Sequence, residues 1–393
     1  MKNWPIMNLA GGPVELTDRT LRDLSRPVIY HYDPAFIEFF EHTCQLLQQV
    51  YRTQYDVVIM QAEAVLGLEA AAACLIAPGD KVLNLVSGVY GKWYESLIEK
   101  YGGQTMELAV PYNEAIDPED VRTALKQNPG IKFLSVVHSE TPSGTVNPVK
   151  EIGPIAKEFG VITIVDTVSG LAGELLSPEE WGMDLAVAGP QKCLGGPAGL
   201  SLLAVSPDAW QAMENRQQPV RDTFLSILDW KRAWLENRRF PYTPSITDMY
   251  GLESVLAQAL EEGLENYTAR HAAIARACRA GVRALGLDLW AAREEVAGTA
   301  VTAVKVPAGL SDGQLRNHMR ERYGVMISGG YGDLLGQLFR LGHMGKAAHP
   351  TYLAAQLAVL ERSLADLGRP INFGAGVGAA MAALEGWGSW TEV

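Results

Sequence analysis

From residue 56 onward, short runs rich in β-branched residues alternate with helical stretches, and this alternation leaves few folds open to the chain. Helices are expected at 63–77, near 91–101 and at 148–159. Strands are expected at 56–60, 81–86, 131–137, 161–165, 184–188 and 199–205. These strands are hydrophobic almost throughout, as strands buried on both faces are. The sequence therefore predicts an α/β fold with a mostly parallel sheet covered by helices on both sides.

The length of 393 residues predicts about two domains, because single hydrophobic cores stop growing below this size. A long helical region follows 241–245 and reaches about residue 286, with the apolar spacing of a helix that links two domains. Shorter strands are expected beyond it, at 298–306, 324–328 and 338–341. We expect an N-terminal arm (1–20), a large domain (21–255) and a small α+β domain (256–393). The Gly-, Ala- and Trp-rich tail, 371–393, has no assigned role.

Charge and composition argue against several classes of partner. The formal net charge is −12 and Lys and Arg do not cluster, which argues against nucleic acid and anionic membranes. Neither a disulfide framework nor a metal site is predicted, since the histidines lack metal-ligand spacing and the cysteines are scattered, at Cys44, Cys74, Cys193 and Cys278. The N-terminus lacks the features of a signal peptide, and no segment is apolar enough to span a bilayer. We expect a cytoplasmic protein.

Polar residues at the carboxyl ends of the predicted strands mark the candidate site, because ligands of open α/β sheets bind there. Asp166 follows the buried run VITIV. A carboxylate in that place is costly unless it faces a cation or several donors, and a protonated pyridine nitrogen is such a cation. A helix cap or loop aspartate is the alternative.

Lys192 lies in the Gly- and Pro-rich turn AGPQKCLGGPAG, between two buried strands. Most lysines are solvated and have no chemical role. Together, however, Lys192 and Asp166 supply what a vitamin B6 ring needs, which is an amine for a Schiff base and a partner for the pyridinium nitrogen.

Three segments carry a family resemblance: SETPSGT (139–145), IVDTVSG (164–170) and GPQKCLGGPAG (189–199). They resemble class V aminotransferases of the alanine-glyoxylate type, in the fold type I group. The resemblance extends from GGPVEL (11–16) through HYDPAF (31–36) to RLGHMG (340–345). It implies a large domain with a mostly parallel seven-stranded sheet, a smaller C-terminal α+β domain, and a homodimer or homotetramer.

The resemblance also implies roles for single residues. Lys192 matches the lysine that forms the Schiff base and moves a proton between the substrate α-carbon and the C4′ carbon of the ring. Asp166 matches the aspartate that keeps the ring nitrogen protonated. Tyr90 matches an aromatic residue stacked on the ring, and Thr141 a hydroxyl near the ring phenol oxygen. Arg340 matches the arginine that binds the substrate carboxylate. A core tyrosine, a turn residue and a structural ion pair are the respective alternatives for the last three.

The chain departs from the family where most members hold the phosphate of pyridoxal phosphate. The matching stretch is QAEAVLGLEAA (61–71), which places Glu63 and Ala64 at the start of the helix and lacks the glycines of a phosphate cup. A helix N-terminus attracts anions, but a carboxylate beside a phosphate dianion repels it. We expect Glu63 to accept a hydrogen bond from a 5′-hydroxymethyl group; a plain helix cap is the alternative.

Four segments, VLNLVSGVYGK, VPYNEAIDP, PYTPSITDMYGLE and RLGHMG, resemble family members that take the unphosphorylated vitamer as a substrate. The resemblance implies that pyridoxamine gives its amino group to pyruvate, yielding pyridoxal and L-alanine in vitamin B6 degradation, with no permanently bound cofactor. Tyr30 and Tyr242 would line the ring pocket, Tyr242 from a neighbouring subunit. Tyr331, in SGGYGD, replaces an expected second arginine, which leaves the preferred keto acid open.

Three other functions compete with this prediction. The nearest is an alanine- or serine-glyoxylate type aminotransferase with resident pyridoxal phosphate. A nonenzymatic carrier or sensor of vitamin B6 would keep the fold and bind the ring without needing Lys192. A nicotinamide dehydrogenase is disfavoured, because no GxGxxG follows an early strand with an acid about 20 residues further on.

Overall fold

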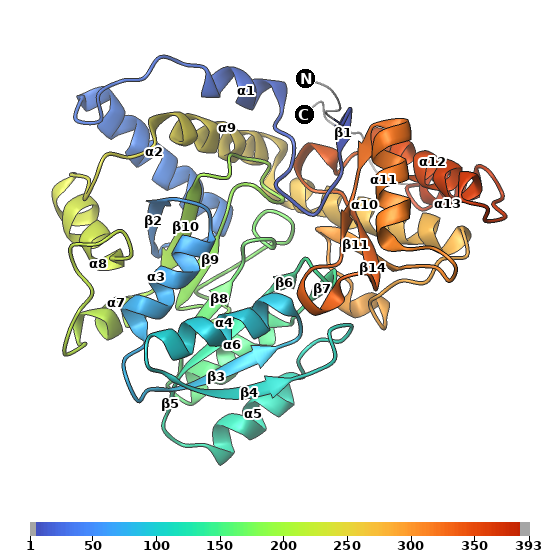
Figure 1. Cartoon of the computed structure of the whole chain (residues 1–393). Coiled ribbons are helices and arrows are strands. Elements are labelled where there is room, and N and C mark those ends of the chain that lie inside the picture. Colours follow the sequence, from blue (N-terminus) through green and yellow to red (C-terminus); the bar gives the residue numbers. More distant parts are fainter. Residues whose placement is uncertain (1–4, 386–393) are drawn as a thin grey trace.

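A seven-stranded sheet forms the centre of the molecule in a computed structural model, which describes residues 5–385 (Figure 1). The strand order is β2-β10-β9-β8-β5-β3-β4, and only β10 runs antiparallel to its neighbours. Its strands are β2 (Asp56–Gln61), β3 (Lys81–Val86), β4 (Gln104–Ala109), β5 (Ile131–Val137), β8 (Ile162–Asp166), β9 (Leu185–Ala188) and β10 (Leu200–Val205). The predicted mostly parallel sheet is therefore confirmed.

The edge strand β4 is the one strand of this sheet that the hydrophobic runs did not reveal. Its residues, QTMELA, are exposed or half-buried, whereas β9 and β10 are buried throughout. An edge strand covered on one side does not need a continuous apolar run, so periodicity alone identifies it poorly. The other six strands lie within a residue or two of their predicted positions.

Helices pack around this sheet, and α3 and α4 lie in front of it in Figure 1. The predicted helices at 63–77, 91–101 and 148–159 correspond to α3, α4 and α6. The helices of this part of the chain are α1 (Asp18–Leu24), α2 (Pro34–Tyr51), α3 (Val65–Leu75), α4 (Val89–Lys100), α5 (Pro118–Gln127), α6 (Val149–Glu158), α7 (Pro207–Glu214), α8 (Ile227–Trp230) and α9 (Ile246–Glu262). A π-helical turn, Lys231–Leu235, continues α8, and a small ribbon joins β6 (Ser139–Glu140) to β7 (Thr145–Val146).

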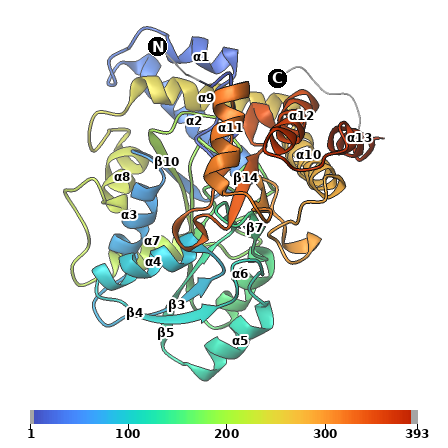
Figure 2. The ribbon, with the colours of Figure 1, turned by 45° about the vertical axis from the view of Figure 1, so that its right-hand side comes forward.

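The seven-stranded sheet and its helices form a first layer. A second layer, built on a three-stranded antiparallel sheet of order β11-β14-β13, lies beside it (Figure 2). Its own hydrophobic cluster includes Phe339, Leu341 and Leu357, all fully buried. The N-terminal arm joins this layer, because β1 (Met7–Asn8) pairs in parallel with β12. Its elements are α10 (Leu264–Ala284), β11 (Val301–Lys305), α11 (Asp312–Tyr323), β12 (Val325–Met326), β13 (Ser328–Gly329), β14 (Leu338–Gly342), α12 (Pro350–Asp366) and α13 (Ala375–Ala382).

The long helical region predicted up to residue 286 is two helices, and its description as one stretch is corrected here. Gly263, with φ of 85°, separates α9 from α10. A residue with a β-carbon rarely adopts this backbone conformation, so glycine permits the break. Tyr267 at the start of α10 packs in the large cluster and Ile274 in the small one, so α10 connects the two cores. The domain boundary near residue 256 stays a prediction.

Part of the C-terminal tail packs onto the second layer. Helix α13 packs against α10 and α12, and Ala380 lies fully buried in the small cluster. The remainder of the tail, 386–393, lies outside the described residues. Within 5–385, no helix combines the length and apolar character that crossing a membrane requires.

Gly67 sets how closely α3 approaches the sheet. A β-carbon there would lie 2.8 Å from Val187 Cγ1 and 3.0 Å from Ser201 Cβ. Both residues belong to the sheet, so the first turn of α3 rests directly on β9 and β10. This contact fixes the segment that precedes the helix, which contains Glu63.

We predict that Gly67→Ala lowers the free energy of unfolding by about 1–3 kcal/mol, the usual cost of overpacking a core. Gly378→Ala is the matched control, since a β-carbon at this helical glycine meets nothing within 4 Å. Denaturant titration followed by circular dichroism measures both. Equal stability of the two variants would contradict this account of α3.

Candidate active site

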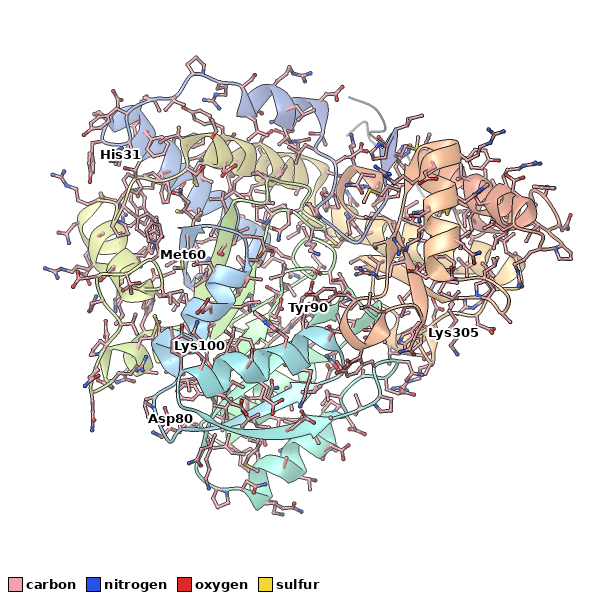
Figure 3. All side chains as sticks on the ribbon, in the orientation of Figure 1. His31, Met60, Asp80, Tyr90, Lys100 and Lys305 are labelled. Atoms are coloured by element: carbon pink, nitrogen blue, oxygen red, sulfur yellow. The ribbon has the colours of Figure 1, made fainter. Side chains whose placement is uncertain are left out.

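A cavity at the carboxyl ends of the strands brings together five of the predicted residues. Glu63, Ala64, Tyr90, Asp166 and Lys192 line it, and its empty volume is about 410 Å³, open mouth included. Tyr90 lies near the centre of the molecule, between the two layers (Figure 3). The site thus forms where the rule for open α/β sheets places it.

Lys192 is held against the N-terminal arm. Its Nζ donates to the carbonyl oxygen of Gly11 at 2.9 Å. Gly12, with φ of 95°, lies so close that a β-carbon there would be 2.7 Å from Lys192 Cδ. Burial, and then the positive charge of Arg340, lower the pKa of the Lys192 amine to about 8. A lysine with this pKa is partly free base near neutral pH, which a nucleophile or proton carrier requires.

Asp166 ends β8 and is buried, and its Oδ1 accepts from the backbone N–H of Val168 at 2.9 Å. Burial raises the pKa of this carboxyl to about 6, against the opposing effects of the Val168 N–H, Lys192 and His138. Asp166 does not cap a helix, since residues 167–199 contain none. Asp166 instead faces the cavity.

Tyr90 stands in the first turn of α4, and a buried glutamate fixes that turn. Glu140 accepts from the backbone N–H of Gly91 at 2.7 Å and from that of Tyr90 at 3.2 Å. Gly88 makes the room, because a β-carbon there would lie 2.4 Å from the Glu140 Cδ. Burial raises the pKa of Glu140 to about 7, although the two N–H groups favour its charged form. Glu140 therefore sets the position from which Tyr90 enters the cavity.

Thr141 and Arg340 are not among the residues that line the cavity, but Arg340 lies near Lys192: a β-carbon on Gly11, whose carbonyl accepts from Lys192, would be 3.0 Å from Arg340 Nη1. Arg340, in β14, donates from Nε to the Gly329 carbonyl at 2.7 Å and from Nη1 to the Thr141 carbonyl at 3.1 Å. No carboxylate pairs with Arg340 within residues 5–385, so the structural ion pair is not observed. The Thr141 hydroxyl is buried and has no hydrogen-bond partner in the described structure. Both groups are left available to a ligand.

Glu63 occupies the start of α3. Its Oε2 accepts from the backbone N–H of Val65 at 2.9 Å, and its Oε1 accepts from Nε2 of Gln191 at 2.6 Å. The next two N–H groups of the helix also have acceptors: Leu66 donates to the Glu63 carbonyl and Gly67 to Ser201 Oγ. Glu63 thus caps the helix, as the alternative expected, and also lines the cavity.

The loop before Glu63 is strained. Ala62 has a φ of 153°, in a region that residues other than glycine rarely adopt. Such strain persists only where surrounding contacts hold it, and Ser201 Oγ donates to the Ala62 carbonyl at 3.0 Å. The strained backbone at Ala62 lowers the stability of the fold, and it sets the position of Glu63.

The three remaining tyrosines differ in their placement. Tyr331 lies beside the site, with its ring centroid 6.1 Å from that of Tyr90. Tyr242 stacks on Phe224 and borders a different cavity. Tyr30 is 66% exposed on the loop between α1 and α2. Its neighbour His31 lies at the upper left of the molecule in Figure 3, away from Tyr90. Within one chain, neither Tyr30 nor Tyr242 lines the active cavity, so their proposed part in a shared site stays a prediction.

Sequence reasoning assigned no role to four contributors to this geometry: Gly11, Glu140, Gln191 and Ser201. Glu140 and Gln191 stand inside the quoted motifs, so their motif positions were the available signal. Gly11 and Ser201 act through contacts 181 and 134 positions away in sequence, to Lys192 and Gly67. Spacing along the chain carries no signal for contacts of this kind.

Comparisons with known proteins agree with this geometry. The family model of class V aminotransferases matches residues 25–338. The chain belongs to the class V aminotransferases. The pyridoxamine–pyruvate transaminase of Mesorhizobium japonicum is 45% identical to it over 381 residues, 97% of each chain.

Solved structures place this class V aminotransferase in the fold type I group. The crystal structure of pyridoxamine-pyruvate aminotransferase from Mesorhizobium loti matches with a TM-score of 0.94 and 45% identity, over 97% of each chain. Ureidoglycine-glyoxylate aminotransferase from Bacillus subtilis matches with a TM-score of 0.91 and 29% identity, over 96% of this chain and 97% of that one. The predicted family and fold are therefore confirmed.

Proposed function

We propose that this aminotransferase moves an amino group from pyridoxamine to pyruvate, giving pyridoxal and L-alanine, and that the ring is a substrate rather than a resident cofactor. A curated relative and a solved structure, each 45% identical to this chain, bear names for pyridoxamine–pyruvate amino transfer. Their similarity spans nearly the whole chain. The single observation that carries the proposal is the occupied start of α3.

The start of α3 offers no cradle for a phosphate. The N–H groups of Val65, Leu66 and Gly67 already have acceptors within the chain, and the charge of Glu63 stands in front of them. A phosphate dianion would meet a carboxylate and three N–H groups that are already bonded. A hydroxymethyl group, in contrast, can donate to the Glu63 carboxylate.

The other side of the cavity fits the rest of a vitamin B6 ring. Asp166 offers a carboxylate for a protonated ring nitrogen, and Tyr90 an aromatic face. The buried Thr141 hydroxyl has no protein partner in the described part of the chain, which suits the ring phenol oxygen. When bound, the ring withdraws electrons from the carbon that carries the amino group, so that a proton on this carbon becomes removable.

The chain's own residues supply binding and proton movement. Arg340 has Nη2 free of protein partners among the described residues and offers a forked contact to the carboxylate of pyruvate or alanine. The Lys192 amine removes a proton at the ring C4′ carbon and returns it at the α-carbon of the amino acid. It then displaces L-alanine from the ring C4′ carbon by forming its own C=N bond to that carbon, and water hydrolyses this bond to release pyridoxal. Asp166 holds the ring nitrogen protonated throughout.

Three further proposals concern the oligomeric state, the location and the domain boundary. We propose a homodimer or homotetramer in which Tyr242, and with it Tyr30, reaches the cavity of a neighbouring subunit. Tyr30 and the neighbouring Val28 are both more than 60% exposed, which supports an interface at this loop. We also propose a cytoplasmic location and a boundary near residue 256 between the two domains.

The first test compares two amino donors, pyridoxamine and pyridoxamine 5′-phosphate, with pyruvate as the acceptor. We expect pyridoxamine to be preferred, with the ratio of kcat/KM at least about 100, because the phosphate meets the Glu63 carboxylate. Alanine formation measures both rates. Preference for the phosphate form, or a stoichiometric phosphate-bearing chromophore in the purified enzyme, would indicate the resident-cofactor alternative.

Substitution of Glu63 tests the same contact from the protein side. Glu63→Ser removes the charge and frees the N–H of Val65, so we expect kcat/KM for pyridoxamine to fall about 10- to 100-fold, the scale of one charged hydrogen bond. The ratio of kcat/KM for pyridoxamine to that for pyridoxamine 5′-phosphate should also fall in this variant. Glu69→Ser is the matched control, since Glu69 lies on α3 and pairs with Lys100 outside the cavity.

The lowered pKa of Lys192 predicts a pH dependence for the capture of pyridoxal. The free amine forms as pH rises through about 8, whereas an ordinary lysine with a pKa of 10.5 stays protonated there. Covalent capture, trapped by borohydride and counted by mass spectrometry, should therefore rise with a midpoint near pH 8. Arg340→Met should move this midpoint to higher pH, because the arginine charge helps to lower the lysine pKa. A midpoint near 10 in the unaltered enzyme would refute this reading.

Arg340 also provides a test of acceptor binding. We expect Arg340→Gln to raise KM for pyruvate and for L-alanine about 100-fold, since charged hydrogen bonds to a carboxylate are lost. At a pH high enough to leave the Lys192 amine unprotonated in both enzymes, KM for pyridoxal should change little, because Arg340 binds the other substrate. Steady-state kinetics in both directions gives all three constants. A parallel rise in all of them would point to general damage of the site instead.

A further inference from the structure

An ion pair packs against the residue that holds Arg340 in place. Arg340 Nε donates to the carbonyl oxygen of Gly329 at 2.7 Å. A β-carbon on Gly329 would lie 2.6 Å from Asp312 Oδ2 and 2.9 Å from Arg316 Nε. Glycine therefore makes the room that lets the pair of Asp312 and Arg316 come so close to the residue that Arg340 binds.

Both members of this pair stand on α11, four residues apart. The helix packs across β13 and β14, the strands that carry Gly329 and Arg340, and Figure 2 shows it beside β14. Arg316 donates from Nε to Asp312 Oδ1 and from Nη2 to Asp312 Oδ2, each at 2.7 Å. Asp312 is only 6% exposed. Arg316 thus uses both oxygens of a buried carboxylate, which needs a cation in such a place.

Arg340 has the opposite requirement, because a substrate carboxylate must find its guanidinium unpaired. Among the described residues, its hydrogen-bond partners are two backbone carbonyl oxygens. Burial has the largest effect on the pKa of Arg340 and lowers it, and the charge of Tyr90 opposes this. Arg316 also lowers the pKa and Asp312 raises it, so both charges of the pair reach Arg340. An anion so near competes with a substrate unless a cation neutralises it.

We propose that Arg316 keeps Arg340 free for the substrate: by occupying both oxygens of Asp312, it prevents this buried carboxylate from pairing with Arg340. Arg316 is thus a positioning residue, since it acts through Asp312 and not by touching the substrate. The inference rests on the proposed role of Arg340 in binding the carboxylate of pyruvate or L-alanine. It is the same whether the ring is a substrate or a resident cofactor.

Steady-state kinetics of Arg316 variants provides the first test. We expect Arg316→Gln to raise KM for pyruvate and for L-alanine about 10-fold, because Asp312 then competes for Arg340 on the scale of one charged hydrogen bond. KM for pyridoxamine and kcat should change little. Arg316→Lys should give a smaller rise, since it keeps the charge but lacks the planar fork that matches both oxygens. An unchanged KM for pyruvate in the folded Arg316→Gln variant would overturn the proposal.

The double variant Asp312→Asn/Arg316→Gln separates a competing charge from structural damage. It removes the anion together with its partner, so KM for pyruvate should return to within about two-fold of the unaltered enzyme. A KM as high as that of Arg316→Gln alone would show that the pair acts only on the structure. Asp312→Asn alone leaves no buried charge unpaired, and its KM for pyruvate should not rise. A 10-fold rise in this variant would equally contradict the inference.

Arg362→Gln is the matched control, because it removes the arginine of another Arg–Asp pair with the same spacing, formed with Asp366 on α12. The Arg362 side chain is mostly exposed and lies over the ring of Phe373. An equal rise of KM for pyruvate in this control would refute a specific role of Arg316. Thermal melting establishes that each variant is folded. The donor comparison does not depend on Arg316, so a failed proposed function shows there and a failed role of Arg316 here.

Discussion

The charge of the Lys192 amine depends on a balance that several parts of the fold maintain together. Removal from water and the proximity of Arg340 make the ammonium form less stable, while Asp166 and Glu63 stabilise it. The sheet supplies Asp166, the start of α3 supplies Glu63, and the second layer supplies Arg340. The relative position of the layers therefore determines how basic the amine is, and with it how the site can react.

The same balance gives the start of α3 its importance. In this fold a helix N-terminus stands at the edge of the active cavity, and bare N–H groups there would attract an anion. This chain has placed its own anion, Glu63, in that position and holds it with Gln191 and a strained residue, Ala62. This local strain is consistent with the proposed binding and release of a neutral hydroxymethyl group.

The fold was largely predictable because six of the seven strands are mostly buried, so their sequences are largely apolar. Strand β4 was missed because its residues are exposed or half-buried, and the break between α9 and α10 because a single glycine, Gly263, makes it. Lys192 and Asp166 could be predicted because strand ends converge in such sheets. Their roles, like those of the other site residues, stay proposals.

Other features depend on contacts between segments far apart in the sequence, and residue spacing does not predict such contacts. Gly11 reaches Lys192, and Glu140 reaches the first turn of α4, only after the chain has folded. Tyr242 raises a related difficulty, since its expected place in the site needs a second chain.

The N-terminal arm has a consequence for the order in which the site is assembled. Gly11 accepts from Lys192 and donates to Ser328, contacts that span 181 and 317 positions of sequence. Closing loops of this length is entropically costly, and long-range contacts of this kind slow folding. The core of the second layer itself includes Leu9 of this arm. The carbonyl partner of the active lysine is therefore in place only when segments far apart in the sequence have met, so the reactive part of the molecule is complete only in the fully assembled fold.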